Sequence, residues 1–418
     1  MHEPLAAPVP TLTSPYASER RLALQAEARQ FAMEEVLPIA NELDPQQAEI
    51  PQSIVERMGE MGYFGITIPT EYGGMGLGVF EYCMVAEELA RAWMSVASII
   101  ARAQGMGTGW GDDANRDRLL RLSAKGQWIG AASLSEPGAG SDLAGVSTRA
   151  VRDGDEWVIT GEKRWTGLAK AADFIQMLVR VSDPKDGESK SRGLATIVIP
   201  KPRGSLPEGV VGEVLPKIGY HGFLTFNLKI DGLRVPAQNM LGSTATFGAS
   251  GATEAGATSP PARSAFKQVE AGLNVARVHT AARAVGLARA ALEDCIAYVQ
   301  EREQFNRPIG DFQAIRFMIA TMAARVDQAR AFYRQVAHLI DEGLPCEREA
   351  AMVKLVATEM AVEVTGDGIQ IHGGNGYTTE RQVERHWRDA RLTTIFEGTS
   401  QIQQKIISDR LLPRSPLG

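Results

Sequence analysis

Residues 148–160, TRAVRDGDEWVIT, decide the fold of this 418-residue chain, because they form a predicted β-hairpin between two long helical regions. Asp153-Gly154 separates two short runs that contain β-branched residues, and this dipeptide is typical of two-residue hairpin turns. Similar short segments follow in WVITGEKRWTG, ADFIQMLVRV and GLATIVIPK, and the series ends near VPAQNMLG. We therefore predict a central β-domain, antiparallel and barrel-like, over residues 128–242.

Helical periodicity precedes this domain. The run RLALQAEARQFAMEEVLPIANELD repeats apolar residues near every 3.6 positions, and Pro38 is expected to end or kink that helix. The turn-rich PTEYGGMGLG then leads into the helix VFEYCMVAEELARAW. No predicted strand precedes these glycines, so we interpret them as a turn rather than as a dinucleotide-binding loop. The sequence predicts an N-terminal helical domain over residues 1–127.

A different composition follows the β-domain. Residues 243–265 consist mainly of Gly, Ala, Ser, Thr and Pro, and such a stretch buries too little apolar surface to order itself. We predict a flexible insertion or linker there. Beyond it, long amphipathic patterns return with short connections between them, which is typical of an antiparallel bundle. The predicted fold class is α+β, with a C-terminal four-helix bundle over residues 266–418.

Composition excludes several classes of protein. The 44 Lys+Arg and 50 Asp+Glu residues give a formal net charge of -6, which argues against a nucleic-acid-binding surface. Cys83, Cys295 and Cys346 are odd in number and far apart, so we predict neither a disulfide framework nor a metal site. Apolar runs stay below the ~18 residues of a membrane span. The start, MHEPLAAPVP, also lacks a signal-peptide pattern, so we expect a cytoplasmic protein that is not integral to a membrane.

Four motifs occur in order along the chain: SLSEPGAGSD at 133–142, GEKRW at 161–165, REQFNRPIGDFQ at 302–313 and the tail QIHGGNGY…RDARLTTIFEGTSQIQ. With the helix–sheet–helix pattern around them, the chain resembles the acyl-CoA dehydrogenase family over nearly its whole length. The resemblance implies an FAD-dependent enzyme that oxidises an acyl-CoA to its 2-enoyl-CoA and passes the electrons to an electron-transfer flavoprotein. It also implies a homotetramer in which subunits share FAD sites.

Such a reaction needs a base, because a proton leaves Cα while a hydride leaves Cβ. Glu397, in IFEGTSQ, matches the family's usual base and precedes a helix that Thr399 or Ser400 is expected to cap. A carboxylate in a dry pocket gains proton affinity and can take this proton. Some relatives carry the base just before the arginine of the first bundle helix. Here that neighbour is Ala276, before Arg277, so no rival base is present. The alternative is an acidic residue that only stabilises a helix start.

The resemblance implies further contacts by position. In the β-domain, the residues expected to lie beside the flavin ring are Leu134, Ser135, Ser141, Trp165, Thr166 and Gly167. In the bundle, the residues expected to reach the pyrophosphate and adenosine, partly of a neighbouring subunit's FAD, are Arg302, Gln304, Phe305, Phe312, Gln313, Gln370, Gly373, Gly374, Thr399 and Gln401. The positions expected to contact CoA are Ser141, Asn274, Arg277 and Gly398. An arginine fork at position 302 would neutralise phosphate, although a solvated helix charge is the alternative. For the charge that develops on the thioester oxygen, the resemblance implies the backbone N–H of Glu397 and a ribityl hydroxyl of FAD as donors.

Two positions depart from the family pattern. The family commonly reads Trp-Ile-Thr-Asn where this chain has Trp165-Thr166-Gly167-Leu168, so the threonine expected near flavin N5 is displaced by one position. A backbone N–H would substitute for it, or Thr166 would reach the flavin if the strand bulges. His221 stands where the family usually has an arginine, and we interpret it as a strand-end residue.

Arg102 lies in SVASIIARAQGMGTGW, the segment expected to line the acyl pocket. A buried arginine without a partner is costly, so Arg102 is expected either to face solvent or to pair with a carboxylate. If that carboxylate belongs to the substrate, the acyl group carries a second acid, as in glutaryl- or substituted succinyl-CoA.

Two other functions remain open at this point. One is an acyl-CoA oxidase or flavin monooxygenase-like relative in which O2 takes the electrons; Glu397 argues against a monooxygenase but not against an oxidase. The other is a catalytically silent flavoprotein that acts as a binding module, which only the displaced threonine supports.

Overall fold

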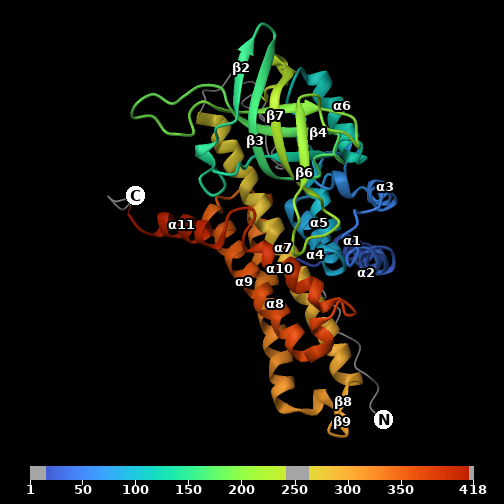
Figure 1. The fold of residues 1–418 in the computed structure, drawn as a ribbon. Helices are drawn as coiled ribbons and strands as arrows, with labels where there is room; N and C mark the ends of the chain where they lie inside the picture. The colour runs from blue at the N-terminus through green and yellow to red at the C-terminus, as the bar shows by residue number, and fades with distance from the viewer. Residues whose placement is uncertain (1–15, 242–262, 414–418) are drawn as a thin grey trace.

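The structure is a computed structural model that describes residues 16–241 and 263–413. It contains N-terminal helices, a sheet domain and a set of long helices, in the predicted order (Figure 1). Most of the predicted linker, residues 243–262, lies outside the described residues. The described chain resumes inside the predicted linker, because the first bundle helix already begins at Arg263. None of the helices in the described ranges is long and apolar enough to cross a membrane.

The N-terminal part consists of six α-helices in the described chain: α1 (Glu19–Phe31), α2 (Leu37–Leu43), α3 (Gln52–Glu60), α4 (Val79–Ala92), α5 (Met94–Ile99) and α6 (Asp113–Ala124). A π-helical segment, Ala32–Val36, joins α1 to α2, and Pro38 lies in the first turn of α2, which confirms the expected interruption. Helix α4 is buried along its whole length, because α1 and α5 cover it on one side and the long C-terminal helices on the other.

The sheet domain has seven strands: β1 (Gly130–Ser133), β2 (Arg149–Asp153), β3 (Glu156–Gly167), β4 (Phe174–Arg180), β5 (Leu194–Pro200), β6 (Val210–Val214) and β7 (Thr225–Pro236). Their order is β1-β4-β2-β3-β7-β6, with β5 paired to β4. Asp153 pairs with Glu156 across the predicted two-residue turn. The sheet is mostly antiparallel, as predicted, but β1 pairs with β4 in parallel. That pairing joins strands far apart in the sequence, so no hairpin signal marks it.

Among the described residues, the C-terminal part contains five α-helices: α7 (Arg263–Glu301), α8 (Gln313–Asp341), α9 (Glu347–His372), α10 (Val383–Thr393) and α11 (Ser400–Leu411). Helix α7 runs from the sheet domain to the far end of the bundle, where β8 (Glu303–Gln304) and β9 (Arg307–Pro308) form a small hairpin (Figure 1). Helices α8 and α9 pack on α7 and on each other, while α10 packs on α7 and α9, which gives the predicted four-helix bundle.

Buried ion pairs join α4 to this bundle. Glu87 lies 3.1 Å from Arg289 and 3.0 Å from Arg330, and Glu88 lies 2.5 Å from Arg289. Burial by itself raises the pKa of Glu87, but the guanidiniums of Arg330 and Arg289 outweigh it and hold that pKa at about 2. Buried charges are tolerated when they are paired in this way. The N-terminal part is therefore fixed to the bundle by internal charge pairs.

A carboxylate at the end of α8 strengthens this junction. Asp341 accepts hydrogen bonds from the backbone N–H groups of Val79, at 2.6 Å, and Phe80, at 2.9 Å. These groups open the first turn of α4, where an anion satisfies unpaired donors and the helix dipole. Gly78 is required here, because a Cβ at that position would lie 2.5 Å from the Asp341 carboxylate.

Candidate active site

Glu397 lies in the short connection between α10 and α11, and it is half-buried. Its φ is 53°, a left-handed value that is uncommon for a residue other than glycine, and Gly398 follows with φ 89°. Thr399 then caps α11, because its Oγ1 accepts a hydrogen bond from the N–H of Ile402 at 3.3 Å. The connection thus holds the carboxylate-bearing residue in a constrained turn directly before a helix N-terminus.

Two buried side chains hold this turn through one carbonyl oxygen. The Gly398 oxygen accepts a hydrogen bond from Lys354 Nζ at 2.7 Å and another from Gln403 Nε2 at 2.8 Å. Lys354 is completely buried, and burial lowers its pKa to about 8. The backbone N–H of Glu397 meets no acceptor in the described part of the chain. That N–H is therefore available to a ligand, as the resemblance implies for the thioester oxygen.

Aromatic side chains surround the base on the side of the sheet domain. The Phe396 ring lies 6.2 Å from the ring of Tyr220, which stacks on Phe223 at 4.8 Å. On the helical side, Tyr82 of α4 stacks on His279 of α7 at 4.4 Å. These rings are buried or half-buried, so the surroundings of position 397 are aromatic and largely apolar.

Sequence reasoning missed three side chains of this region: Tyr82, His279 and Arg283. Burial lowers the pKa of His279 well below its usual value, and the nearby guanidiniums of Arg283 and Arg102 lower it further, so this imidazole is neutral at pH 7. The Arg283 guanidinium lies 4.8 Å from the centre of the Phe396 ring. Tyr82, His279 and Arg283 sit inside helices with many apolar neighbours, and helical periodicity by itself does not distinguish a core position from a chamber wall.

The predicted flavin contacts of the β-domain come from the segment after β1 and from the end of β3. Leu134 and Ser135 follow β1, and the Ser135 oxygen accepts a hydrogen bond from Arg164 N–H at 2.9 Å. Trp165 of β3 is 56% exposed and has φ 66°, while Ser141 is exposed in the loop between β1 and β2. An exposed indole near the end of β3 offers a flat surface on which an aromatic ring system can stack.

The displaced threonine has a partner inside the protein. The pairing of β3 with β7 shifts register between Lys163 and Thr166, so the strand does bulge. Thr166 is nevertheless completely buried, and its hydroxyl lies 2.9 Å from the Ser133 hydroxyl. At Gly167 a Cβ would lie 2.2 Å from the Phe223 ring, so the absence of a side chain there has a packing reason. His221, the other departure, contacts Asp44 and Lys217 near the end of its loop rather than the base.

Some of the predicted pyrophosphate and adenosine residues lie around the β8–β9 hairpin, at the other end of the bundle from α11, which directly follows the turn of Glu397 (Figure 1). Arg302, Gln304 and Phe305 belong to the exposed β8–β9 hairpin, and Phe305 is 87% exposed. The Phe312 ring lies 6.1 Å from that of Phe305, and Gln313 opens α8 beside it. One subunit therefore does not bring these residues to its own Glu397, which fits the implied sharing of sites between subunits.

The remaining predicted residues fall into two groups. Gln370 lies in the last turn of α9, before Gly373 and Gly374, where nothing lies within 4 Å of an added Cβ, so a ligand can approach the backbone closely. Gln401 is exposed in the first turn of α11, beside Thr399. Near the base, Arg277 donates a hydrogen bond to Asn274 at 2.7 Å on α7. The exposed indole, the cationic hairpin and the open glycines together fit a flavin dinucleotide.

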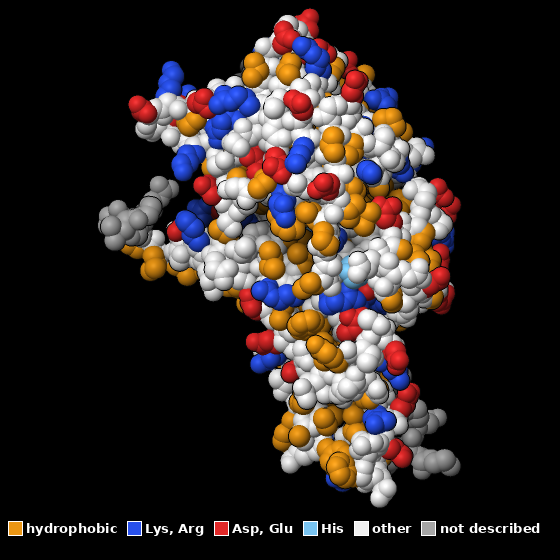
Figure 2. Space-filling model, in the orientation of Figure 1, with side chains coloured by type: hydrophobic (Ala, Val, Ile, Leu, Met, Phe, Trp, Pro, Cys, Tyr) orange, Lys and Arg blue, Asp and Glu red, His pale blue; other side chains and the backbone are white. Residues whose placement is uncertain are grey.

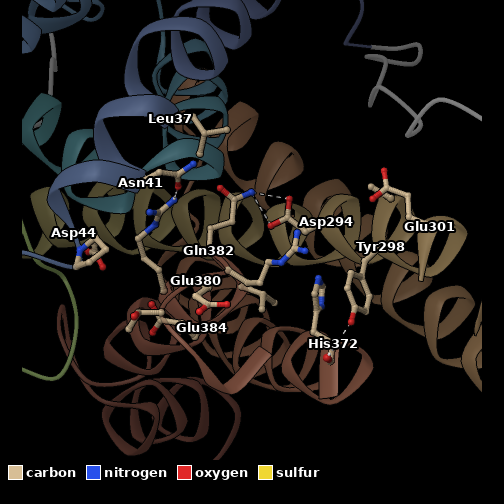
Figure 3. A pocket seen from close by; sticks show the side chains of 16 residues that line it. Leu37, Asn41, Asp44, Asp294, Tyr298, Glu301, His372, Glu380, Gln382 and Glu384 are labelled. Atoms are coloured by element: carbon tan, nitrogen blue, oxygen red, sulfur yellow. Dashed lines mark hydrogen bonds between the residues drawn. The ribbon is translucent and has the colours of Figure 1, made fainter. Parts of the chain in front are cut away.

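A separate polar pocket of about 490 Å³ lies between α2, α7 and the segment that leads into α10 (Figure 3). Gln382 and Asp294 are hydrogen-bonded at 2.8 Å inside it, and Asn41 accepts a hydrogen bond from Arg385 at 2.9 Å. None of the predicted site residues lines this pocket, so we do not assign the reaction to it.

Comparison with known families identifies the fold. Three stretches match the family descriptions "Acyl-CoA dehydrogenase, N-terminal domain" at residues 18–127, "middle domain" at 131–233 and "C-terminal domain" at 266–412. The probable acyl-CoA dehydrogenase YngJ of Bacillus subtilis is 37% identical over 92% of this chain and 96% of its own. The (2S)-methylsuccinyl-CoA dehydrogenase of Cereibacter sphaeroides is 36% identical over 92% of this chain and 68% of its own.

A solved structure gives the same result. A chain from a study of the electron transferring flavoprotein of Acidaminococcus fermentans superposes with a TM-score of 0.84 and 31% identity, covering 96% of this chain and all of that chain. The protein therefore belongs to the acyl-CoA dehydrogenase family, whose members are flavoprotein oxidoreductases that bind FAD and act on CH–CH bonds.

Proposed function

We propose that this protein is an acyl-CoA dehydrogenase that converts an acyl-CoA thioester into its 2-enoyl-CoA, with Glu397 as the base. The observation that carries this proposal is the position of Glu397 in a strained turn beside a group of aromatic rings, with its own backbone N–H unpaired within the described chain. A carboxylate and an N–H donor from one residue can serve the two ends of an enolate: the first removes the Cα proton and the second stabilises the oxygen.

Bound FAD supplies the two-electron acceptor for the hydride that leaves Cβ. The protein's own residues perform the remaining tasks. Glu397 takes the Cα proton, its backbone N–H donates to the thioester oxygen, and Lys354 and Gln403 keep the turn in place through Gly398. The aromatic side chains exclude water, which strengthens each of these interactions. The acyl group thus loses one proton to Glu397 and one hydride to the cofactor, and no oxygen is added.

Subunit assembly belongs to the same proposal. Phe305, Phe317 and Tyr377 are 87%, 62% and 88% exposed, and Figure 2 shows hydrophobic side chains gathered over the bundle below the sheet domain. Exposed aromatic residues of this kind mark protein interfaces. They support a homo-oligomer, a tetramer by family resemblance, in which the β8–β9 hairpin of one subunit reaches the FAD of another.

An electron-transfer flavoprotein is the proposed electron acceptor, and the likeness to a chain from a study of such a flavoprotein supports it. The acyl group is left open by the relatives' names, since one acts on methylsuccinyl-CoA and the other is named only for acyl-CoA. The three cysteines are unpaired and buried, which supports a reducing compartment, and we propose the cytoplasm.

The test is anaerobic titration of the FAD-loaded protein with straight-chain, branched, cyclic and dicarboxylic acyl-CoAs. We expect at least one of them to bleach the flavin, and we expect Glu397→Gln to keep FAD while its bleaching rate falls by about 10³-fold or more. Glu363→Gln, an exposed carboxylate on α9, is the matched control. Rapid reoxidation of the bleached protein in air would instead indicate an oxidase. Absence of bleaching by every thioester would indicate a silent flavoprotein, and retained turnover in Glu397→Gln would remove the assignment of the base.

A further inference from the structure

Two arginine side chains lie beside the aromatic rings that surround the proposed base. Arg283 of α7 is only 4% exposed, and its guanidinium faces the ring of Phe396, the residue directly before Glu397, at 4.8 Å. Arg102 follows α5, and its guanidinium lies 5.5 Å from the ring of Phe223. Because Phe223 stacks on Tyr220 and Tyr220 contacts Phe396, both arginines border one continuous group of aromatic rings.

The hydrogen bonds of Arg283 go to uncharged groups, and the nearby Glu397 carboxylate only partly opposes the lowering of its pKa by burial without forming an ion pair in the described residues. Its Nη1 donates to the Ser98 hydroxyl at 2.6 Å and its Nη2 to the Thr280 hydroxyl at 2.9 Å, while its buried Nε has no partner. Hydroxyl groups satisfy N–H donors but carry no negative charge. The hydroxyl of nearby Tyr82 does not supply one either, because burial raises the pKa of that phenol far above neutral pH.

Arg102 has fewer hydrogen-bond partners than Arg283 in the described residues. Its buried Nε has no hydrogen-bond partner in the described ranges, and its guanidinium lies over the Phe223 ring. Across those same ranges, neither Arg102 nor Arg283 forms an ion pair with any carboxylate. The two side chains nevertheless lie close enough together to lower the pKa of His279 jointly, after burial itself.

Buried arginines elsewhere in this protein provide a comparison, because their partners are groups of the protein itself. Arg289 pairs with Glu87 and Glu88, and Arg91 pairs with Glu293 at 2.7 Å. Arg180 and Arg385 are also buried and bond neutral oxygens instead, Arg180 four backbone carbonyls and Arg385 the Asn41 amide and the Ala92 carbonyl. Arg102 and Arg283 differ from all of these, because two guanidiniums lie at one place and, in the described residues, neither bonds a carboxylate or a carbonyl oxygen; an anion from outside the chain would stabilise them.

Resting on the proposed function, we infer that Arg102 and Arg283 bind a second carboxylate on the acyl group, so that the substrate is a dicarboxylic acyl-CoA thioester. Guanidinium groups suit this role because they bind a carboxylate through two parallel hydrogen bonds. The diacid is short, because Arg283 lies against the residue next to the base and its carboxylate partner must lie near the reacting Cα. Arg102 and Arg283 are thus specificity-determining residues, separate from the proton transfer at Glu397.

The test compares glutaryl- and methylsuccinyl-CoA with butyryl- and hexanoyl-CoA in anaerobic bleaching of the FAD-loaded protein. We expect kcat/KM to favour the dicarboxylic thioesters by on the order of 100-fold, because a monocarboxylic acyl group offers no carboxylate to the buried Arg283 or the half-buried Arg102. Arg283→Gln and Arg102→Gln are each expected to remove most of that preference by slowing the dicarboxylic substrates. Arg102→Lys, which keeps the charge, is expected to retain part of it. Arg121→Gln is the matched control, because Arg121 also lies over an aromatic ring, Tyr72 at 5.6 Å, but on exposed α6.

The outcomes separate the two proposals. The dicarboxylate site is overturned if butyryl-CoA bleaches the flavin as well as or better than the dicarboxylic thioesters. It is also overturned if both glutamine variants keep the same substrate preference. In either case the proposed desaturation still stands. Absence of bleaching by all four thioesters defeats the proposed function instead. Calorimetric binding of glutaryl- and butyryl-CoA to Glu397→Gln gives a second readout without turnover, and equal affinities there also overturn the site. If Arg283→Gln does not fold, the half-buried Arg102 still decides the question through its own two variants.

Discussion

The ammonium group of Lys163 lies 2.8 Å from the carboxylate of Glu136 and 3.0 Å from the carbonyl oxygen of Leu134. Lys163 is completely buried in β3, whereas Glu136 belongs to the loop after β1 that carries the predicted flavin contacts. Glu136 also accepts hydrogen bonds from Ser147 and Thr148 at the start of β2. One ion pair therefore joins the SLSEPGAGSD and GEKRW motifs and fixes the loop that faces the cofactor.

Breaking this pair is expected to destabilise the β-domain. Lys163→Met leaves a buried carboxylate without its cation, so we expect the free energy of unfolding to fall by about 2–4 kcal/mol in urea titrations. The double variant Lys163→Met/Glu136→Gln is expected to lose less than the sum of the two single variants, because the second change removes the unpaired charge. Additive losses in this cycle would mean that the two groups do not interact.

Acid is expected to weaken the same loop. Burial opposes ionisation of Glu136, but the hydrogen bonds from Lys163 and Thr148 hold its pKa at about 2, below the ordinary 4.5. Because the pKa is lowered on folding, this stabilisation is complete above pH 4.5 and is lost as the pH falls from 4.5 towards 2. Urea titrations between pH 3 and 6 should show a falling stability that is flatter in Glu136→Gln. Identical slopes would contradict the assignment.

Lys354 is expected to act as a positioning residue for Glu397. Lys354→Met removes the 2.7 Å hydrogen bond to the Gly398 oxygen, so the strained turn that carries the base becomes less well fixed. We expect kcat to fall by about 10-fold or more, with FAD content and KM little changed, because misplacement of a base affects the chemical step. Lys405→Met, an exposed lysine of α11 that pairs with Asp409, is the control. A change in KM alone would assign Lys354 to substrate binding instead.

Arg302 offers a test of the shared cofactor site. Its side chain is exposed on the far hairpin, so Arg302→Gln is expected to leave the apoprotein's thermal stability unchanged. FAD retained after gel filtration should nevertheless fall, by about 10-fold in affinity, because a charge-assisted contact to phosphate is lost. Arg325→Gln, also exposed in the bundle, serves for comparison. Unchanged FAD retention in Arg302→Gln would show that this hairpin does not reach the cofactor.

The three-part architecture could be predicted from the sequence because apolar residues repeat with a different spacing in the helical parts and in the sheet part. The hairpin at Asp153-Gly154 and the long stripes of the bundle were confirmed for that reason. The parallel pairing of β1 with β4 was not predicted, since it depends on contacts between distant segments. The resemblance selected Glu397, but it did not identify Arg283 or Lys354, whose roles appear only when α7 and α9 are placed beside the turn. Arg102 was noticed from the sequence because a charge interrupts an apolar helix.

The pairing of Glu87 and Glu88 with Arg289 and Arg330 affects how the protein unfolds. These carboxylates belong to α4 and the guanidiniums to α7 and α8, so separating the N-terminal helices from the bundle would strand four charges in an apolar interior. The first and last thirds of the polypeptide are therefore a single cooperative unit that melts together. A fragment cut near residue 127 would be an unfolded or aggregating chain rather than an autonomous module.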